Sequence, residues 1–258
     1  MTTIPQLLTG KRALITGTGR GQGEVIQRIF SSMGASVVGC DIRSGSAEAT
    51  AASLFDAGHK VYGKTVDLGD PEAAAEWVNW GARQLGGFDV LFNNASKPIM
   101  EPFGAISLDG WQTTIRNELD LVFYVTKAAW PHLLKSGNAS VITTASASGK
   151  LGWGSVGQAA HSAAKAGVIG FTKQIAAEGG KLGIRANTIS PGYIAGPGTA
   201  GIISKETEDY IRNTIQIDPR PLTPEDIAMT AAFLASDLSR GITGEDIAVD
   251  AGWAAGRP

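Results

Sequence analysis

The sequence predicts an α/β fold with a doubly wound parallel sheet of about seven strands and helices on both faces, because short apolar runs alternate with longer helical patterns. Helix signals separate these runs. Asp70-Pro71-Glu72, for example, combines an acidic N-cap with proline at the first helical position. The predicted strands cover residues 13–16, 36–40, 61–66, 90–92, 140–143, 185–189 and 247–249. No linker or low-complexity segment interrupts the alternation, so residues 1–258 are expected to form a single domain.

One late segment departs from the alternation. Between about residues 192 and 222, glycine, proline and threonine interrupt a series of isoleucines. Loops this long inside a compact domain usually serve function. We therefore expect this segment to form a lid or a pocket wall rather than a domain boundary.

Composition favours a cytoplasmic protein that acts on a small molecule. The chain has 258 residues, of which 43% are hydrophobic, and its net charge of −2 gives no indication of nucleic-acid binding. It has no apolar run of 18 residues, and its first residues lack the order of a signal peptide, so no membrane contact is expected. The single cysteine, Cys40, cannot form an internal disulfide. His59 and His132 lie apart from any cysteine or acidic group at ligand spacing, so no metal site is predicted.

A glycine-rich turn follows the first predicted strand. Residues 16–23 have the sequence TGTGRGQG, and apolar residues then return at helical spacing at positions 25, 26, 29 and 30. Glycine lets the backbone approach a diphosphate closely, and the first N–H groups of the following helix face its negative charge. Because glycines also serve ordinary tight turns, this stretch predicts a nucleotide site only together with other features.

Asp41 supplies the second feature. It follows the second predicted strand about twenty residues after the glycine turn, where a carboxylate can accept hydrogen bonds from the adenosine ribose and would repel a 2′-phosphate. The sequence therefore favours NAD over NADP as the cofactor. Arg20 and Arg43 lie close enough in sequence to soften that preference, because an arginine near this ribose accommodates a 2′-phosphate.

The motifs, in their order along the whole chain, resemble those of the classical short-chain dehydrogenase/reductase family. Residues 16–23 are similar to its cofactor loop, residues 93–96 (NNAS) to its Asn-Asn-Ala-Gly turn, and Ser146-x-x-Gly149 to the strand end that carries its catalytic serine. The resemblance implies a Rossmann-type fold and a nicotinamide cofactor. The cofactor-binding residues that it implies are Gly17, Arg20, Gly21, Gln22, Gly23, Asp41, Arg43, Asp67, Leu68, Asn94, Ala95, Lys165, Pro191, Gly192 and Ile194.

The resemblance fails at one catalytic position. The family's acid/base tyrosine should stand four residues before Lys165, but His161 stands there, and no tyrosine lies between Tyr124 and Tyr193. The resemblance further implies that Ser146 contacts the substrate oxygen, that Lys165 binds the nicotinamide ribose and that Asn117 holds a proton-relay water. We interpret His161 as a natural replacement of the tyrosine, with an engineered substitution as the alternative.

His161 favours one direction of reaction. An imidazole is mostly neutral at physiological pH, so it can accept a proton from an alcohol. Donating a proton to a ketone requires the imidazolium, which the nearby charge of Lys165 disfavours. Alcohol oxidation is therefore easier to support than carbonyl reduction, with a water relay where the short ring does not reach the substrate.

The residues around the reactive end predict an apolar or aromatic-tolerant substrate pocket. Its expected lining is Ser96, which stands where the family has glycine, together with Trp153 and Tyr193. Ile194, Ile202 and Ile203 add apolar surface. Gly196 stands where the family has a threonine that anchors the nicotinamide amide, and Thr199 is the candidate substitute.

The leading hypothesis is an NAD-dependent oxidoreductase that interconverts a secondary alcohol and a ketone, with Ser146, His161, Lys165 and Asn117 as the catalytic set. Two alternatives stay open. One is a non-redox enzyme of the same fold that performs elimination, isomerisation or carbon–carbon cleavage with His161 as the base; the other is an NAD-binding pseudoenzyme. The resemblance also implies a homotetramer or homodimer, with residues 252–255 (GWAA) at one interface.

Overall fold

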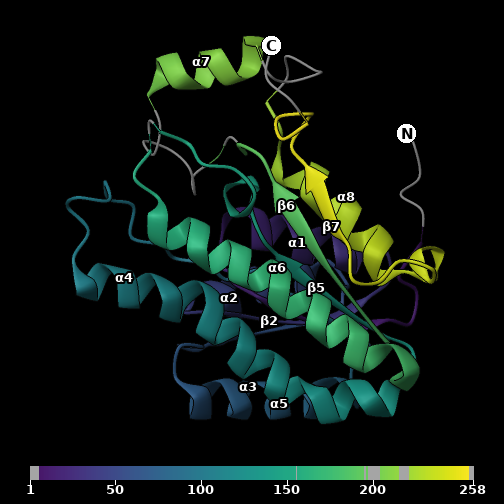
Figure 1. Ribbon diagram of the computed structural model, residues 1–258. Helices are drawn as coiled ribbons and strands as arrows, with labels where there is room; N and C mark the ends of the chain where they lie inside the picture. Colours follow the sequence, from purple (N-terminus) through teal and green to yellow (C-terminus); the bar gives the residue numbers. More distant parts are fainter. Residues whose placement is uncertain (1–5, 155, 195, 197–203, 215–220, 256–258) are drawn as a thin grey trace.

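The seven strands form one parallel sheet in the order β3-β2-β1-β4-β5-β6-β7 (Figure 1). The structure is a computed structural model that describes residues 6–154, 156–194, 196, 204–214 and 221–255. The strands are β1 (Arg12–Thr16), β2 (Ser36–Asp41), β3 (Val61–Thr65), β4 (Val90–Asn93), β5 (Ala139–Thr144), β6 (Ile184–Pro191) and β7 (Asp246–Val249). Each matches a predicted strand to within two residues at either end, and the predicted fold class is confirmed.

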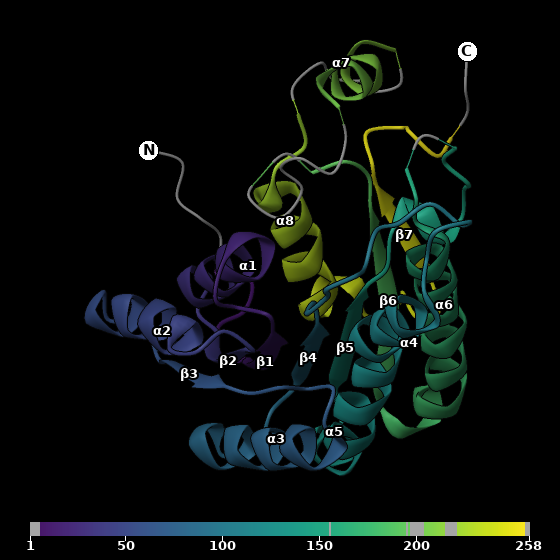
Figure 2. The same cartoon turned by 90° about the vertical axis from the view of Figure 1, so that its left-hand side faces the viewer.

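Helices cover both faces of the sheet (Figure 2). One face packs against α1 (Gly21–Ser32), α2 (Ser46–Asp56) and α8 (Pro224–Ala235), and the other against α3 (Pro71–Leu85), α5 (Leu121–Ser136) and α6 (Ala159–Gly179). Two further helices are α4 (Leu108–Ile115) and α7 (Lys205–Thr214). Among the described residues, no helix is both long enough and apolar enough to cross a membrane.

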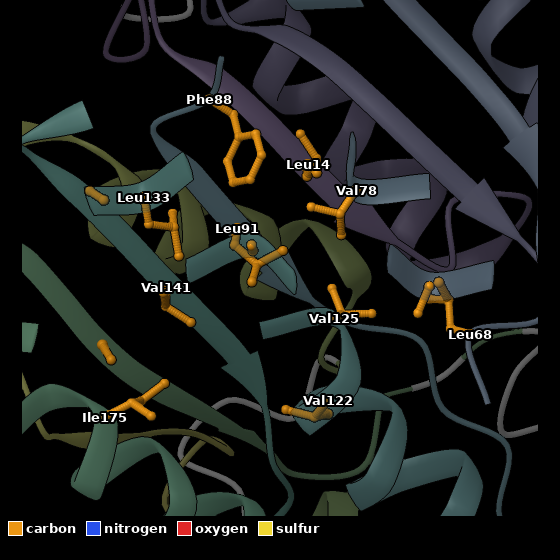
Figure 3. Close-up of a cluster of buried hydrophobic side chains, with 14 of the residues drawn as sticks. Leu14, Leu68, Val78, Phe88, Leu91, Val122, Val125, Leu133, Val141 and Ile175 are labelled. Atoms are coloured by element: carbon orange, nitrogen blue, oxygen red, sulfur yellow. The ribbon is translucent and has the colours of Figure 1, made fainter. Parts of the chain in front are cut away.

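The period of two along each strand divides the core into two layers. In β1, Leu14 belongs to the cluster under α3, α5 and α6, whereas Ile15 belongs to the cluster under α1 and α8. Figure 3 shows the first cluster, in which Leu14 and Leu91 from neighbouring strands lie with Val78 of α3. The central strands are therefore buried on both faces of the sheet, which explains the nearly continuous apolar runs in the sequence.

Local signals set the helix ends. The Asp70 carboxylate accepts hydrogen bonds from the backbone N–H groups of Glu72 (2.8 Å) and Ala73 (3.2 Å), and Pro71 opens α3. This helix start is as predicted. Gly86, with φ +70°, ends the same helix in the left-handed region that favours glycine.

The ends of β1 and β4 are joined by side chains. Thr16 Oγ1 accepts hydrogen bonds from the N–H groups of Asn94 and Ala95, both at 2.9 Å, and Asn94 Nδ2 donates to the Thr16 carbonyl at 3.1 Å. Gln22 Nε2, in the first turn of α1, donates to Asn94 Oδ1 at 2.8 Å. The strand order reverses direction between β1 and β4, and ligands of open α/β sheets bind at such a switch point.

A π-helical segment, Arg116–Asp120, connects α4 and α5. Single π turns inside longer helices often occur at functional sites, because the extra residue changes which side chain points inward. Here the buried residue of the turn is Glu118.

Asp89, just before β4, joins the amino ends of β1 and β4. Arg12 Nε and Nη2 donate to the two carboxylate oxygens at 3.0 and 2.8 Å, and the Ser136 hydroxyl donates at 3.0 Å. Burial by itself raises the pKa of Asp89, but the hydrogen bonds from Arg12 and Ser136 and the charge of Arg12 outweigh it, so the pKa lies below its usual value.

We expect Asp89→Asn to lose stability in a pH-dependent way. Because the folded-state pKa is depressed, the stabilisation is complete above the unfolded pKa of about 4 and disappears as the pH falls through the folded pKa. The free energy of unfolding in urea should therefore differ by roughly 1–3 kcal/mol between the native protein and the variant at pH 7. The difference should shrink below about pH 4. Asp56→Asn, at the exposed end of α2, is the control. A difference that grows on acidification would contradict the assignment.

We expect Gly23→Ala to destabilise the protein. A Cβ at Gly23 would overlap the Gly17 carbonyl and lie 2.7 Å from Asn94 Nδ2, so the turn would have to move. Overpacking of this kind typically costs about 1–3 kcal/mol in urea unfolding. Gly170→Ala is the matched control, because a Cβ there meets nothing within 4 Å and alanine suits a helix interior. Equal stability of the two variants would refute a close approach at Gly23.

Candidate active site

The candidate site lies at the carboxyl edge of the sheet. Thr16, Asp41, Asn93 and Pro191 are the last residues of β1, β2, β4 and β6, and Ser146 follows β5 by two residues. Because parallel strands all end at the same edge, the sheet gathers residues that are far apart in the sequence. In both cartoon views, α7 lies beyond the carboxyl end of β7 and apart from the other helices (Figures 1 and 2).

Asp41 lies at the glycine turn, as expected for a ribose ligand. Its side chain is 8% exposed, and its oxygens accept hydrogen bonds from the Gly19 N–H and from the Arg43 N–H, Nε and Nη2, each at 3.0 Å. Burial by itself raises the pKa of Asp41, but these hydrogen bonds and the Arg43 charge bring it below its usual value. The carboxylate is therefore ionised, and it binds the Arg43 guanidinium through both of its oxygens.

The glycine turn is built for a close backbone approach. Gly17 has φ +75°, and a Cβ there would lie 2.9 Å from Ala95 Cα. Gly21 has φ +60° and opens α1, while Arg20 is exposed at the N-cap and its side chain makes no cap hydrogen bond. The first N–H groups of α1 therefore have no side-chain cap, as in the anion sites found at helix N-termini.

Asp67 and Leu68, two of the residues predicted to bind the cofactor, have different surroundings. Asp67 accepts hydrogen bonds from Arg116 Nη2 at 2.8 Å and from the Gly69 N–H at 2.9 Å. Burial by itself raises the pKa of Asp67, but Arg116 and Gly69 bring it below its usual value. Leu68 is buried in the core cluster. Arg116 was not anticipated from the sequence.

The reactive end is organised around Glu118, whose side chain is 0% exposed. Oε2 lies 2.7 Å from His161 Nδ1, while Oε1 accepts a hydrogen bond from the Ser96 hydroxyl and lies 3.8 Å from Lys165 Nζ. Burial by itself would raise the pKa of Glu118, but the charge of Lys165 and the contacts with His161 and Ser96 bring it below its usual value. Glu118 is therefore a buried carboxylate at the centre of the candidate site.

Lys165 and His161 lie one turn apart on α6. The Lys165 side chain is 4% exposed, and its Nζ donates to the Thr144 carbonyl at the end of β5 at 3.0 Å. Burial lowers the pKa of Lys165, and the charge of Glu118 opposes that shift without cancelling it. The His161 side chain is 14% exposed. The predicted pairing of positions 161 and 165 on one helix face is thus present, with Glu118 touching both.

Ser146 lies against the same helix. It caps the short 3₁₀ turn Ala147–Gly149, where its Oγ accepts a hydrogen bond from the Ser148 N–H at 3.1 Å. A Cβ at Gly149 would lie 3.0 Å from the Lys165 carbonyl carbon and the Ala166 nitrogen. Glycine three residues after the serine therefore lets this strand end pack directly on the backbone of Lys165.

Asn117 is not brought into this group. Its Nδ2 donates to the Lys97 carbonyl at 3.3 Å, and its Oδ1 accepts from Arg116 Nη1 at 3.1 Å. The π turn points the next residue, Glu118, at Lys165 and His161 instead. The place predicted for a relay asparagine therefore holds a carboxylate. Ser96, predicted to face the substrate, has its hydroxyl hydrogen-bonded to that carboxylate.

The structure describes some of the residues predicted to line the substrate pocket. The Trp153 ring meets Trp253, from the segment after β7, edge-on with centroids 4.4 Å apart. Tyr193 is half-buried, Gly196 is among the described residues, and Ile194 is buried and bridges to Leu222. Gly192 approaches Asp250 so closely that a Cβ would lie 2.9 Å from its Cα. Thr199, Ile202, Ile203 and much of the 192–222 segment lie outside the described residues.

Glu118 could have been found from its place in the helical pattern. Thr114, Val122, Val125 and Ala129 lie on the buried face of α4 and α5, and Glu118 falls at the corresponding step between them. An acid on an apolar stripe needs a buried cation, and Lys165 on a largely apolar helix needs a buried anion. In the described part of the chain, no group of three or more His, Cys, Asp or Glu side chains could hold a metal ion.

Known proteins resemble this chain over nearly its full length. A family model described as "Enoyl-(Acyl carrier protein) reductase" matches residues 17–254. Meso-2,3-butanediol dehydrogenase of Serratia marcescens is 36% identical, with 94% of each chain covered. D-threitol dehydrogenase of Mycolicibacterium smegmatis is 33% identical, with 95% of this chain and 94% of the relative covered.

A reductase and a solved structure extend the comparison. The 3-oxoacyl-(acyl-carrier-protein) reductase FabG of Chlamydia muridarum is 33% identical, with 96% of this chain and 99% of the relative covered. A crystal structure described as a short-chain alcohol dehydrogenase from Sinorhizobium meliloti 1021 has a TM-score of 0.90 and 29% identity, with 98% and 99% of the chains covered. On the family match, these relatives and the sheet that gathers the site residues, the chain belongs to the short-chain dehydrogenase/reductase family of oxidoreductases.

Proposed function

We propose that this protein is an NAD-dependent oxidoreductase that interconverts a secondary alcohol and a ketone, with His161 as the acid/base. The observation that carries the proposal is the cluster of His161, Lys165 and the Glu118 carboxylate beside the Ser146 turn, at the sheet edge that also holds Asp41 and the glycine turn. Its dehydrogenase relatives support the reaction class.

The residues present fit a nicotinamide dinucleotide. The close packing at Gly17 and Gly23 brings the backbone of the turn against Asn94 and Ala95 with no room for a side chain, and the first turn of α1 offers uncapped N–H groups to a diphosphate. Asp41 would hold the adenosine ribose, and Lys165 the nicotinamide ribose. When bound, the nicotinamide ring supplies the hydride acceptor for alcohol oxidation and the hydride donor for ketone reduction.

The protein residues would handle the proton and the substrate oxygen. In oxidation, the His161 ring takes the proton of the substrate hydroxyl as the carbonyl forms, and in reduction it returns that proton. The Ser146 hydroxyl would hold the substrate oxygen beside His161 by a hydrogen bond. The Trp153 ring packs edge-on against Trp253, and these two aromatic side chains support an apolar or aromatic alcohol as the substrate.

We further propose that the protein assembles as a homodimer or homotetramer. The support is an aromatic pair across α5 and α6, in which Phe123 meets Phe171 edge-on at 6.3 Å. Phe123 remains 44% exposed in the single chain. A large apolar side chain at the surface is suited to a contact between copies.

We expect calorimetry to show that NAD binds at least 10-fold more tightly than NADP, because the ionised Asp41 repels a 2′-phosphate. Asp41→Ser removes that charge and releases the Arg43 fork, so the ratio of the two dissociation constants should move toward NADP by roughly 10-fold or more. Asp56→Ser removes the same charge from the exposed end of α2 and should leave the ratio unchanged. Tighter binding of NADP by the native protein would refute the NAD preference.

We expect NADH absorbance to rise when the native protein is mixed with NAD and a panel of aliphatic and aromatic secondary alcohols. His161→Gln should lower kcat by about 100-fold or more, because the acid/base is lost, while the dissociation constant for NAD changes little. His132→Gln, on the surface of α5, should leave kcat unchanged.

Three results would count against the proposal. Full kcat in His161→Gln would remove His161 from the proton transfer. Turnover without a change in the oxidation state of the cofactor would favour a non-redox enzyme. Tight NAD binding with no turnover of any alcohol, and no effect of His161→Ala on any function, would favour a pseudoenzyme.

A further inference from the structure

Two departures from the family resemblance, Ser96 and His161, touch the same buried carboxylate. Both hydrogen-bond to Glu118, which the π turn points into the site in place of Asn117. We propose that Glu118 is a positioning residue that holds the neutral His161 ring with its proton on Nδ1 and its lone pair on Nε2, facing the substrate. This rests on the acid/base role proposed for His161 above.

The hydrogen-bond partners of Glu118 determine which atom carries the proton. The carboxylate is ionised, so its oxygens can only accept. Oε1 takes the Ser96 hydroxyl and lies near the Lys165 ammonium, and Oε2 is left for His161 at 2.7 Å. His161 Nδ1 must then be the donor, which leaves Nε2 as the acceptor in the neutral ring.

A histidine in this position needs such a partner. The hydroxyl of a tyrosine can donate or accept at one atom, whereas an imidazole has two ring nitrogens, only one of which is basic in the neutral ring. The wrong tautomer would present an N–H to the substrate hydroxyl and could not take its proton. A carboxylate on Nδ1 removes that tautomer, so Glu118 makes His161 competent as a base.

Glu118 also changes the charge balance at the site. Lys165 and Glu118 are both almost fully buried, with their charged atoms 3.8 Å apart, so their charges compensate. A proton on His161 then leaves one net positive charge in the group of three rather than two. The sequence-based expectation considered the Lys165 charge alone, whereas the structure places the opposite charge of Glu118 beside both Lys165 and His161.

The test that does not depend on turnover is the tautomer itself. Long-range ¹H–¹⁵N NMR of histidine-labelled protein distinguishes a protonated from an unprotonated ring nitrogen, and His161 is assigned by the signals lost in His161→Gln. The neutral ring of His161 should carry its proton on Nδ1. His132, whose Nε2 lies 3.0 Å from Asn79 Oδ1, should carry it on Nε2 and serves as an internal reference. A native His161 protonated on Nε2 overturns the proposal, whether or not any alcohol is oxidised.

Glu118→Gln is the matched substitution. The donors Ser96 and Lys165 would select the amide oxygen, so the amide NH₂ would face His161 Nδ1 and force the other tautomer. We expect the ¹⁵N pattern of His161 to reverse and kcat to fall about 100-fold, with KM and the dissociation constant for NAD within about threefold of native. Glu118→Asp, which keeps the charge, should restore part of kcat.

Asp89→Asn is the control for the loss of a partly buried acid, and it should leave both kcat and the His161 tautomer unchanged. An unchanged tautomer and kcat in a folded Glu118→Gln would overturn the positioning role, even if His161→Gln is inactive and the acid/base proposal stands. If Glu118→Gln does not fold, the tautomer of the native protein still decides the question.

Discussion

The junction between β1 and β4 is the constraint on which the rest of the structure depends. Thr16 accepts three hydrogen bonds, two from Asn94 and one from Ala95, that fasten the two strand ends, and Gln22 ties the first turn of α1 to Asn94. The sheet extends in opposite directions from this point, and open α/β sheets bind their ligands at such a junction. Gly17 and Gly23 contain no side-chain atoms that would push these segments apart. The place proposed for the dinucleotide is thus a consequence of how the two halves of the sheet meet.

The second organising element is a buried charge pair. Lys165 on α6 and Glu118 in the π turn would each be costly to bury alone, and together they compensate. Their geometry sets the surroundings of His161, which hydrogen-bonds to the same carboxylate.

Most of the fold and part of the site followed from local sequence signals. Apolar runs fixed the strands because both faces of the sheet are buried, and Asp70-Pro71 fixed the start of α3 because capping is a local interaction. Asp41 was found because it follows a predicted strand after the glycine turn, and Ser146, Lys165 and His161 were found through the family resemblance. Asn117 was chosen over Glu118 because its residue type matches the relay asparagine of the family, whereas Glu118 is the residue that falls on the buried face shared by Thr114 and Val122.

The sequence by itself determined the order of strands and helices, the glycine turn and the histidine at position 161, because these depend on residue identity and on periodicity along the chain. Only the tertiary structure decided that Glu118 meets His161, Lys165 and Ser96, that Arg43 engages Asp41, and that Trp253 meets Trp153. Apart from the local Asp41–Arg43 pair, these contacts join elements that are distant in the sequence. They follow from how the sheet and its helices pack.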